Sequence, residues 1–327
     1  MRDVIVIGGG PAGSTAATLL ARQGFSVLLL ERERFPRFQI GESLLPYNND
    51  LFERLGVSEQ LDCGDFFPKY GAIFVTGDGK VGCSFRFDQT LEDPYRKSFQ
   101  VRRAEFDHLL LRNAAASGVE VREETAVAAI DLADPDEATI RTHGGEELKA
   151  RFVIDASGHN AVLGSRVGSR HDIRELKKIA CFAHYRGVTR PEGREGGSTV
   201  IVVLQNAWFW LIPVSAEVMS VGVVLDRDDF LQAGLTPEQM LEKTIAETPF
   251  VLGRMESAER ITQVYARKDF SFRMRNTVGT NYALAGDAAG FLDPIFSTGV
   301  FMAMKSADMA AHAVALRLRT GSTAALT

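Results

Sequence analysis

Residues 3–31 read DVIVIGGGPAGSTAATLLARQGFSVLLLE, and this stretch decides the fold. The β-branched run at residues 3–7 is typical of a parallel strand that is buried on both faces. The Ala- and Leu-rich residues 14–23 predict a helix that Gly24 ends, and residues 25–30 predict a second strand that closes on Glu31. The stretch is therefore a complete strand–helix–strand unit, which predicts an α/β fold with a parallel sheet.

The turn inside this unit has the spacing Gly8-x-Gly10-x-x-Gly13. The first glycine permits a tight turn, the second lets the backbone approach a pyrophosphate, and the third lets helix and strand pack closely. The helix that follows presents unpaired N–H groups and its positive dipole end to the phosphates. Glu31 is placed to accept hydrogen bonds from ribose hydroxyls. Because strand, helix and acidic residue all accompany the turn, it predicts a dinucleotide site rather than a purely structural turn.

The composition sets limits on function. The chain has 327 residues, of which 45% are hydrophobic, so it can bury a sizeable core as one large or two interleaved domains. A net charge of -5 gives no indication of nucleic-acid or anionic-membrane binding, and no apolar run approaches the roughly 18 residues of a membrane helix. Cys63, Cys83 and Cys181 contain no CxxC, so we expect buried, inert thiols and no metal site. Because residues 1–8 already form a strand, we also expect no signal peptide and a cytoplasmic location.

A second glycine-containing turn follows an apolar strand far along the chain. Residues 286–290, GDAAG, resemble the second FAD signature of aromatic hydroxylase-like flavoproteins, in which the aspartate accepts a hydrogen bond from the ribityl chain. The segment QVR at 100–102 occupies the place of that family's flavin-contacting arginine, and DASG at 155–158 resembles the turn packed beneath the nucleotide. The resemblance implies FAD as the cofactor. Because the chain has no second GxGxxG for a nicotinamide cofactor, we expect a separate flavin reductase to supply reduced FAD.

This resemblance also implies the fold class. We expect an α/β protein with a two-dinucleotide-type, Rossmann-like FAD-binding domain and an inserted antiparallel β-sheet substrate domain. The FAD-binding domain is expected to be discontinuous, with residues 1–68, 100–165 and 279–327. Residues 69–99 and 166–278 are expected to form the substrate-side sheet. Two strand candidates there, residues 199–205 and 220–225, lie on either side of an aromatic segment.

Both tryptophans of the chain lie in this aromatic segment, WFWLIP at residues 208–213. An apolar aromatic segment is ordinarily plain core. This one matches the WxWxIP signature of flavin-dependent halogenases, in which bulky rings are proposed to keep the organic substrate away from the flavin. The chain thus resembles these enzymes, which implies that it uses reduced FAD, dioxygen and halide to make hypohalous acid. The implied reaction is electrophilic halogenation of an electron-rich aromatic substrate in secondary metabolism.

A further match is FLDPIFSTG at residues 291–299, which fits the F-x-D-P-[LI]-x-S-x-G segment of the same family. The resemblance implies that the backbone N–H groups of Thr298 and Gly299, backed by a helix dipole, bind chloride or bromide. The alternative is that they only hold the flavin carbonyl. Tryptophan halogenases have a glutamate where this chain has Phe296, which favours phenol, pyrrole or carrier-tethered aryl substrates over free tryptophan. For the final proton loss, the sequence selects no base.

Lys69 begins the segment KYGAIF at residues 69–74, which resembles the family's K-x-[GSA]-A-x-F strand. A lysine at a strand start is ordinarily a solvated edge charge. In the family this lysine is thought to deliver the halogen, because an amine in a water-poor cavity can bind hypohalous acid and present it to a ring. The segment GESLLP at residues 41–46 resembles the family's flavin-covering loop.

The resemblance therefore implies a full set of site residues. The catalytic ones are Lys69, Trp208, Trp210 and Ser297. The cofactor-binding ones are Gly8, Gly10, Pro11, Ala12, Gly13, Ser14, Glu31, Arg32, Glu42, Ser43, Arg102, Val127, Asp155, Gly158, Gly286, Asp287, Pro294, Gly299 and Val300.

Other interpretations stay open from the sequence. A flavin monooxygenase or a geranylgeranyl-reductase-like FAD oxidoreductase explains the FAD signatures equally well, but it gives Lys69 and the two tryptophans no role. A further interpretation is a non-catalytic flavoprotein. Halogenases usually continue for many residues in helices that close over the substrate cavity, and we expect this cap to be absent here. An open cavity would admit water, and hypohalous acid would then leak out or be quenched.

Overall fold

The computed structural model describes residues 1–64, 66–167, 170–173, 176–268 and 271–322. One mixed sheet carries the first glycine turn, in the order β7-β2-β1-β10-β9-β8, with β19 also paired to β10. Strands β7, β2, β1, β10 and β19 run parallel, whereas β10, β9 and β8 form antiparallel pairs. The strands are β1 (Arg2–Ile7), β2 (Val27–Leu30), β7 (Glu120–Arg122), β8 (Val127–Asp134), β9 (Glu137–Thr142), β10 (Glu147–Asp155) and β19 (Tyr282–Leu284).

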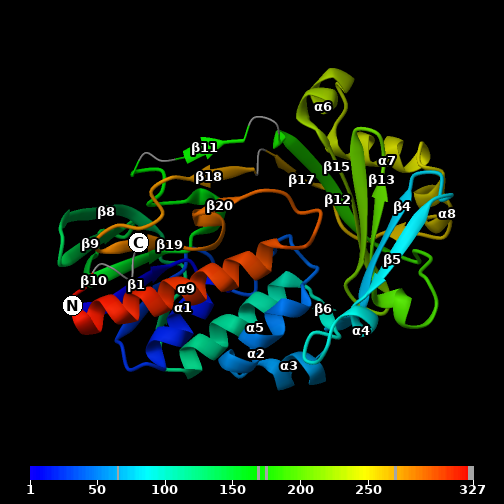
Figure 1. The fold of residues 1–327 in the computed structure, drawn as a ribbon. Coiled ribbons are helices and arrows are strands. Elements are labelled where there is room, and N and C mark those ends of the chain that lie inside the picture. The colour runs from blue at the N-terminus through cyan, green and yellow to red at the C-terminus, as the bar shows by residue number, and fades with distance from the viewer. Residues whose placement is uncertain (65, 168–169, 174–175, 269–270, 323–327) are drawn as a thin grey trace.

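Helices α1, α5 and α9 cover one face of this sheet, and α1 packs against both of the others (Figure 1). Alanines on α1 and α9 are buried in their shared core, because small side chains let the two helices approach closely. The helical elements of this half are α1 (Pro11–Ala21), η1 (Pro46–Asn48), α2 (Asn49–Leu55), α3 (Ser58–Cys63), α5 (Arg103–Ala116), η2 (Gly158–Asn160), η5 (Gly286–Ala288) and α9 (Gly299–Thr320).

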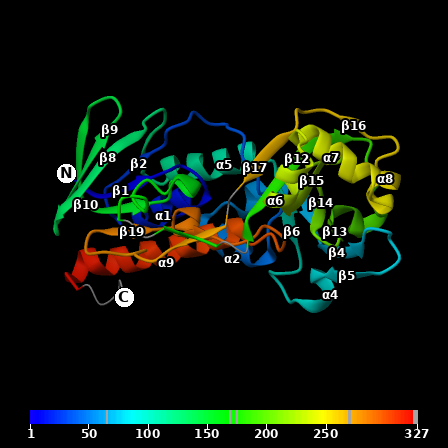
Figure 2. The ribbon, with the colours of Figure 1, turned by 90° about the horizontal axis from the view of Figure 1, so that it is seen from above.

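A second, mostly antiparallel sheet has the order β16-β12-β15-β14-β13-β4-β5, with β17 also paired to β12. Its strands are β4 (Gly71–Thr76), β5 (Gly82–Arg86), β12 (Lys178–Arg186), β13 (Thr199–Val203), β14 (Ala207–Pro213), β15 (Val218–Asp226), β16 (Glu259–Arg260) and β17 (Tyr265–Lys268). Alternate residues point to opposite faces. One face packs on α7 (Pro237–Ala246) and α8 (Pro249–Arg254), and the other carries Trp210 and faces the first half of the molecule (Figures 1 and 2).

Short elements complete the description. Their bounds are β3 (Phe67–Lys69), α4 (Phe87–Thr90), β6 (Ser98–Gln100), β11 (Arg170–Asp172), η4 (Gly193–Gly197), α6 (Arg227–Ala233), β18 (Phe272–Met274) and β20 (Gly290–Phe291). Strands β3 and β6 pair with each other, and β11, β18 and β20 form a small sheet. No helix in the described ranges combines the length and the apolar character that crossing a membrane requires.

The structure confirms the mixed α/β class and changes several local expectations. The aromatic segment expected between two strands is itself the strand β14, because both of its faces are covered and it shows no polar alternation. Cys63 and Cys83 are exposed, so the expectation of buried thiols holds only for Cys181.

Candidate functional site

The glycine turn after β1 leaves no room for a side chain at Gly8 or Gly13. A Cβ added to Gly13 would lie 1.8 Å from the Gly8 carbonyl oxygen, and one added to Gly8 would lie 2.4 Å from the Ala156 carbonyl oxygen. At Gly10 an added Cβ would meet only the Arg37 guanidinium, at 3.4 Å, so the backbone there is open to a ligand. The Glu31 carboxylate is buried beside the turn and accepts a 2.6 Å hydrogen bond from the Gly9 N–H. These features suit a bound pyrophosphate and ribose.

The second glycine turn lies against the first, although more than 270 residues separate them. A Cβ added to Gly286 would lie 3.0 Å from the Cβ of Ala12, and Gly286 itself has a φ of +62°. The next residue, Asp287, is partly exposed and pairs with Nδ1 of His159 at 3.1 Å. The two segments expected to hold FAD thus form one cradle that side chains would fill, which fits the cofactor.

Asp155 has a structural role in this cradle. Its carboxylate accepts hydrogen bonds from the backbone N–H groups of Ser157 at 3.0 Å and Leu163 at 2.7 Å. Its carbonyl accepts one from the Ala285 N–H at 2.9 Å. The residue therefore fixes the turn beneath the cradle, and the following Gly158 adopts a φ of +68°.

The structure places the other expected cofactor residues in several elements. Three of them are buried in the first turn of α1, namely Pro11, Ala12 and Ser14. Arg32 is exposed and pairs with Glu33 at 3.7 Å, Val127 begins β8, and Pro294 and Val300 flank the start of α9.

Arg102, which was expected to contact the flavin, has a part-exposed guanidinium that pairs with Glu105. The neighbouring Arg103 is buried, bonds both oxygens of Asp107 and donates to the Ile40 carbonyl at 2.7 Å. Charge interaction with Asp107, and also with Asp287 and Glu42, outweighs burial and keeps the pKa of Arg103 above its ordinary value. Arg103 thus anchors the loop at residue 40, and its i, i+4 spacing to Asp107 was the signal that the sequence analysis missed.

The two tryptophans form an aromatic wall on the inner face of the second sheet. Their ring centroids are 5.9 Å apart, and Trp210 is buried and donates from Nε1 to the Ser220 hydroxyl at 3.1 Å. Its ring is accommodated by Gly222, directly opposite on β15, where an added Cβ would lie 2.3 Å from the indole. Phe291 and Ile295, from the segment before α9, pack against the same cluster. The wall therefore stands beside the segment expected to face the flavin.

Lys69 was expected at the start of a strand, but it is the last residue of β3, and it is almost fully buried. Its Nζ donates to the Ser43 hydroxyl at 2.8 Å and to the Leu44 carbonyl at 2.9 Å, and it lies 5.6 Å from the centroid of the Phe87 ring. Burial lowers the pKa of Lys69 to about 7. The side chain is therefore not a solvated edge charge but an amine that is partly neutral near pH 7.

The start of α9 holds the residues expected to bind halide. Thr298 is the N-cap residue and Gly299 the first helical one, so their N–H groups have no acceptor within the helix. Ser297 has a φ of +57°, which is strained for a residue with a side chain. Burial raises the pKa of Asp293, four residues earlier, against the opposing hydrogen bond from the Ile295 N–H. Phe296 is exposed, with its ring centroid 6.3 Å from that of Phe74.

An acid–base pair that the sequence did not reveal joins the loop at residues 41–46, expected to cover the flavin, to β12. Glu42 Oε1 lies 2.7 Å from His184 Nε2, and Oε2 of Glu42 is buried without a hydrogen-bond partner among the described residues. Burial lowers the pKa of His184, but the hydrogen bond and the charge of Glu42 outweigh it and leave the pKa above its ordinary value. No local sequence pattern connects these residues, since they are 142 positions apart.

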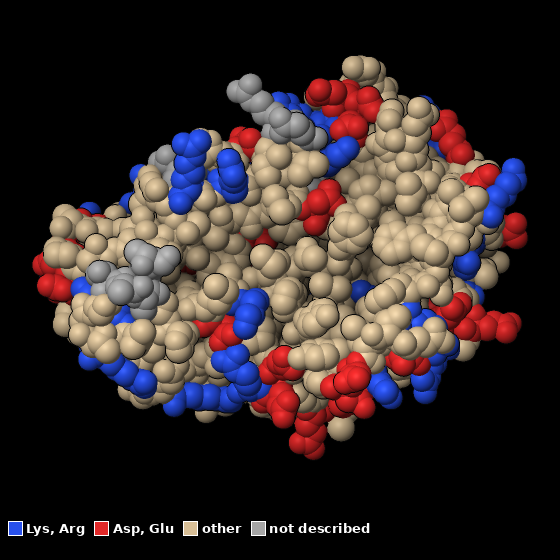
Figure 3. Space-filling model, in the orientation of Figure 1, with Lys and Arg blue, Asp and Glu red and all other residues tan. Residues whose placement is uncertain are grey.

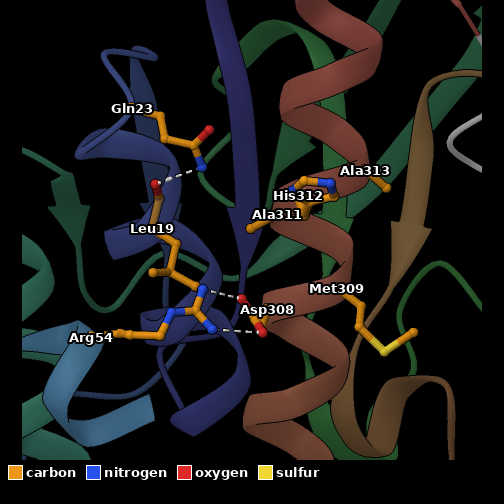
Figure 4. Close-up of a pocket in the computed structure, with 8 residues that line it drawn as sticks. All are labelled: Leu19, Gln23, Arg54, Asp308, Met309, Ala311, His312 and Ala313. Atoms are coloured by element: carbon orange, nitrogen blue, oxygen red, sulfur yellow. Dashed lines mark hydrogen bonds and ion pairs between the residues drawn. The ribbon is translucent and has the colours of Figure 1, made fainter. Parts of the chain in front are cut away.

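Other surface features lie outside this site. An open depression of about 450 Å³ between α1 and α9 contains the Arg54–Asp308 ion pair, and none of the expected site residues lines it (Figure 4). Between the two sheets, the face seen in Figure 3 is largely uncharged, and the Lys, Arg, Asp and Glu side chains gather around its margin. Among the described residues, no group of three or more His, Cys, Asp and Glu side chains could hold a metal ion.

Comparison with known proteins adds independent information. A family model described as an FAD binding domain matches residues 1–327. The 1H-pyrrole-2-carbonyl-[peptidyl-carrier protein] chlorinase of Pseudomonas fluorescens is 31% identical over 94% of this chain and 74% of its own length. The corresponding brominase of Pseudoalteromonas luteoviolacea is 34% identical over 95% of this chain and 77% of its own length. The tryptophan 2-halogenase of Chondromyces crocatus is 33% identical over 95% of this chain, which spans only 60% of that enzyme.

Solved structures agree with these relatives. The myxobacterial chondrochloren halogenase CndH superposes with a TM-score of 0.92 at 36% identity, over 98% of this chain and 76% of that one. The brominase Bmp2 superposes with a TM-score of 0.90 at 33% identity, over 99% of this chain and 81% of that one.

Proposed function

We propose a mechanism for this chain on the premise that it belongs to the flavin-dependent halogenases. Relatives in that family match it at 31% and 34% identity over almost its whole length. FAD-dependent halogenation is accordingly its activity, with chloride or bromide as co-substrate, and the monooxygenase and reductase alternatives are set aside. We propose the roles of individual residues, the substrate class and the protein partners.

The residues of the two glycine turns would hold FAD. Gly8, Gly10 and Gly13 would admit the pyrophosphate to the α1 N-terminus, Glu31 would bind the ribose, and Asp287 would bind the ribityl chain. Bound there in its reduced form, FAD would supply two of the four electrons that reduce dioxygen; the halide would supply the other two, giving hypohalous acid and water. Thr298 and Gly299 would hold the halide at the positive end of α9.

Lys69 is the proposed halogen carrier, and its burial as a hydrogen-bonded amine is the single observation that carries this role. A neutral amine attacks the halogen of hypohalous acid: an N–halogen bond forms, the O–halogen and one N–H bond break, and water leaves. The halogen then passes to a ring carbon of the substrate, the ring loses a proton, and the amine recovers its own. Trp208 and Trp210 would keep the organic ring away from the flavin.

We further propose a pyrrole or phenol substrate, tethered to a carrier protein. Two of the relatives are named for pyrrole-2-carbonyl carrier proteins, and residue 296 is a phenylalanine that offers no carboxylate for an indole substrate. A separate flavin reductase would supply the reduced cofactor. In this proposal residues 1–68, 100–165 and 279–327 form the FAD-binding domain, and residues 69–99 and 166–278 form the substrate-side domain.

The test supplies the purified protein with reduced FAD, halide and dioxygen, together with free and carrier-tethered pyrroles and phenols. We expect halogenated products, and more from the tethered pyrrole than from free pyrrole. Hydroxylated products without halogenated ones would reject the proposed function.

Lys69→Ala separates the role of the amine from cofactor binding. We expect halogenation to fall by about 100-fold or more, the usual loss for a catalytic proton-transfer or nucleophilic group. FAD binding, measured by flavin fluorescence, should be unchanged. A variant that still halogenates at the wild-type rate would exclude Lys69 as the carrier.

A further inference from the structure

Ser43, expected to bind cofactor, also contacts the Lys69 amine. Its buried hydroxyl accepts a hydrogen bond from Lys69 Nζ at 2.8 Å and lies 2.8 Å from the Thr199 hydroxyl. Thr199 in turn accepts from Gln100 Nε2 at 2.9 Å, and the same amide donates to the Gly197 carbonyl at 3.0 Å. All three polar residues are buried, so the network is screened from water.

The donors and acceptors of this network are mutually compatible. Lys69 donates to Ser43, either hydroxyl can donate in the Ser43–Thr199 contact, and the Thr199 oxygen accepts from Gln100. A neutral amine has two hydrogens and one lone pair. The Ser43 hydroxyl and the Leu44 carbonyl accept the two hydrogens, which leaves the lone pair as the one unassigned position on Nζ.

We propose that Ser43 is a positioning residue, which with the Leu44 carbonyl orients the Lys69 amine so that its lone pair faces the incoming hypohalous acid. The inference rests on the proposed role of Lys69. It gives the Ser43 side chain a role besides the expected cofactor binding, because both of its hydroxyl contacts in this structure are to side chains that lead to Lys69 or to β13.

The loop that carries both acceptors is held from several sides. The Leu44 N–H donates to the Phe99 carbonyl at 3.0 Å, and the Val101 N–H donates to the Glu42 carbonyl at 2.7 Å. Glu42 reaches β12 through His184, whereas Ser43 reaches β13 through Thr199. The strands β15 and β14 lie between β12 and β13. Adjacent residues of the loop are therefore hydrogen-bonded to the sheet on both sides of β14, the strand that carries Trp210. The acceptors are therefore fixed before any substrate arrives, as orientation of a reacting group requires.

No carboxylate is bonded to Lys69 among the described residues, so hydrogen bonds rather than an ion pair orient it. The charged groups on the elements packed around it have other partners. Glu42 pairs with His184, Arg194 pairs with Asp88, and Glu195 accepts a hydrogen bond from Ser84.

The test compares Ser43→Ala with Ser43→Thr, which keeps a hydroxyl, and with Ser257→Ala, a control at an exposed serine. Ser43→Ala should lower kcat by about 10-fold or more, the scale of a misoriented reacting group, with unchanged FAD affinity. Ser43→Thr should restore part of the rate, and Ser257→Ala should behave as wild type. Thr199→Val, which removes the second anchor of Ser43, should show a smaller loss of the same kind.

A measurement on the amine itself makes the result independent of turnover. In ¹⁵N NMR titrations of Lys69 Nζ in the FAD-bound protein, Ser43→Ala should lower the pKa further, because the ammonium form loses an acceptor. The acidic limb of the pH–rate profile should move in the same direction. An unchanged titration, or a loss of FAD affinity with normal kcat at saturating FAD, would overturn the proposal. If the wild type makes no halogenated product, the proposed function fails, and the titration still decides whether Ser43 controls the amine.

Discussion

At the residue scale, the burial of Lys69 makes stability depend on pH in a definite direction. Its pKa is about 7 in the folded protein and its ordinary value is 10.5, so between these limits the unfolded chain binds more protons than the folded one. Lys69 therefore makes the free energy of unfolding increase as pH rises from about 7 to about 10. Lys69→Met removes this dependence, because methionine does not titrate.

The expected outcome is that the Tm of the wild type, relative to that of Lys69→Met, increases between pH 7 and pH 10. Calorimetry of both proteins in the same buffers measures it, and Lys149→Met, at an exposed lysine, is the control. A difference that stays flat or decreases would show that the amine is not held in a poorly solvated site.

Local chemistry made part of this site predictable from the sequence. Gly8, Gly13 and Glu31 were identified because a tight turn and a strand end dictate their residue types. Lys69 was identified only through a motif, since its burial depends on Ser43 and Phe87. His184 was missed because its partner is 142 positions away, and contacts at that separation leave no periodic trace.

At the element scale, the strand β14 depends on a glycine in its neighbour. Gly222 faces Trp210 on one side and Phe182 on the other, where an added Cβ would lie 2.3 Å and 2.6 Å from their atoms. Gly222→Ala should therefore displace the indole and lower the free energy of unfolding by about 1–3 kcal/mol, as overpacking of a core does. Denaturant unfolding measures the loss, and a changed emission of the two tryptophans reports the displacement.

Gly253→Ala is the matched control, because that glycine lies within α8 with no atom within 4 Å of an added Cβ. It should be neutral or slightly stabilising, since alanine favours a helix. Equal effects of the two substitutions would mean that the space at Gly222 is not required.

The elements themselves were predicted unevenly. The helical spacing of apolar residues at 104–117 predicts a helix, and Thr236 with Gln239 has the spacing of a capping box; the structure contains both features, in α5 and at the start of α7, because periodicity and capping are local signals. The sequence also predicts a terminal helix at residues 306–318, which is too short, since α9 already begins at Gly299. Its first turn is defined by the packing of Val300 and Met304 in a core with α2 and α5, which the sequence does not display.

At the scale of the whole molecule, the Glu42–His184 pair ties the first half of the chain to the second sheet. The pKa of His184 is raised above its ordinary 6.5, so the stabilisation that the pair provides is complete below that value. It is lost as pH rises through the pKa of the folded state. The advantage of the wild type over His184→Gln in free energy of unfolding should therefore be larger at pH 6 than at pH 9. Urea unfolding at the two pH values tests this, with the exposed His143→Gln as control.

The contact between Gly286 and Ala12 means that the two halves of the cradle are synthesised at different times. When the ribosome has synthesised the first two hundred residues, the glycine turn at residues 8–13 exists, but the turn at Gly286 that packs against it does not. Only when the segment leading into α9 emerges can α9 pack on α1 and complete the cradle. We therefore expect the flavin to bind only after α9 has been synthesised, and the apolar side of α1 to remain exposed until then.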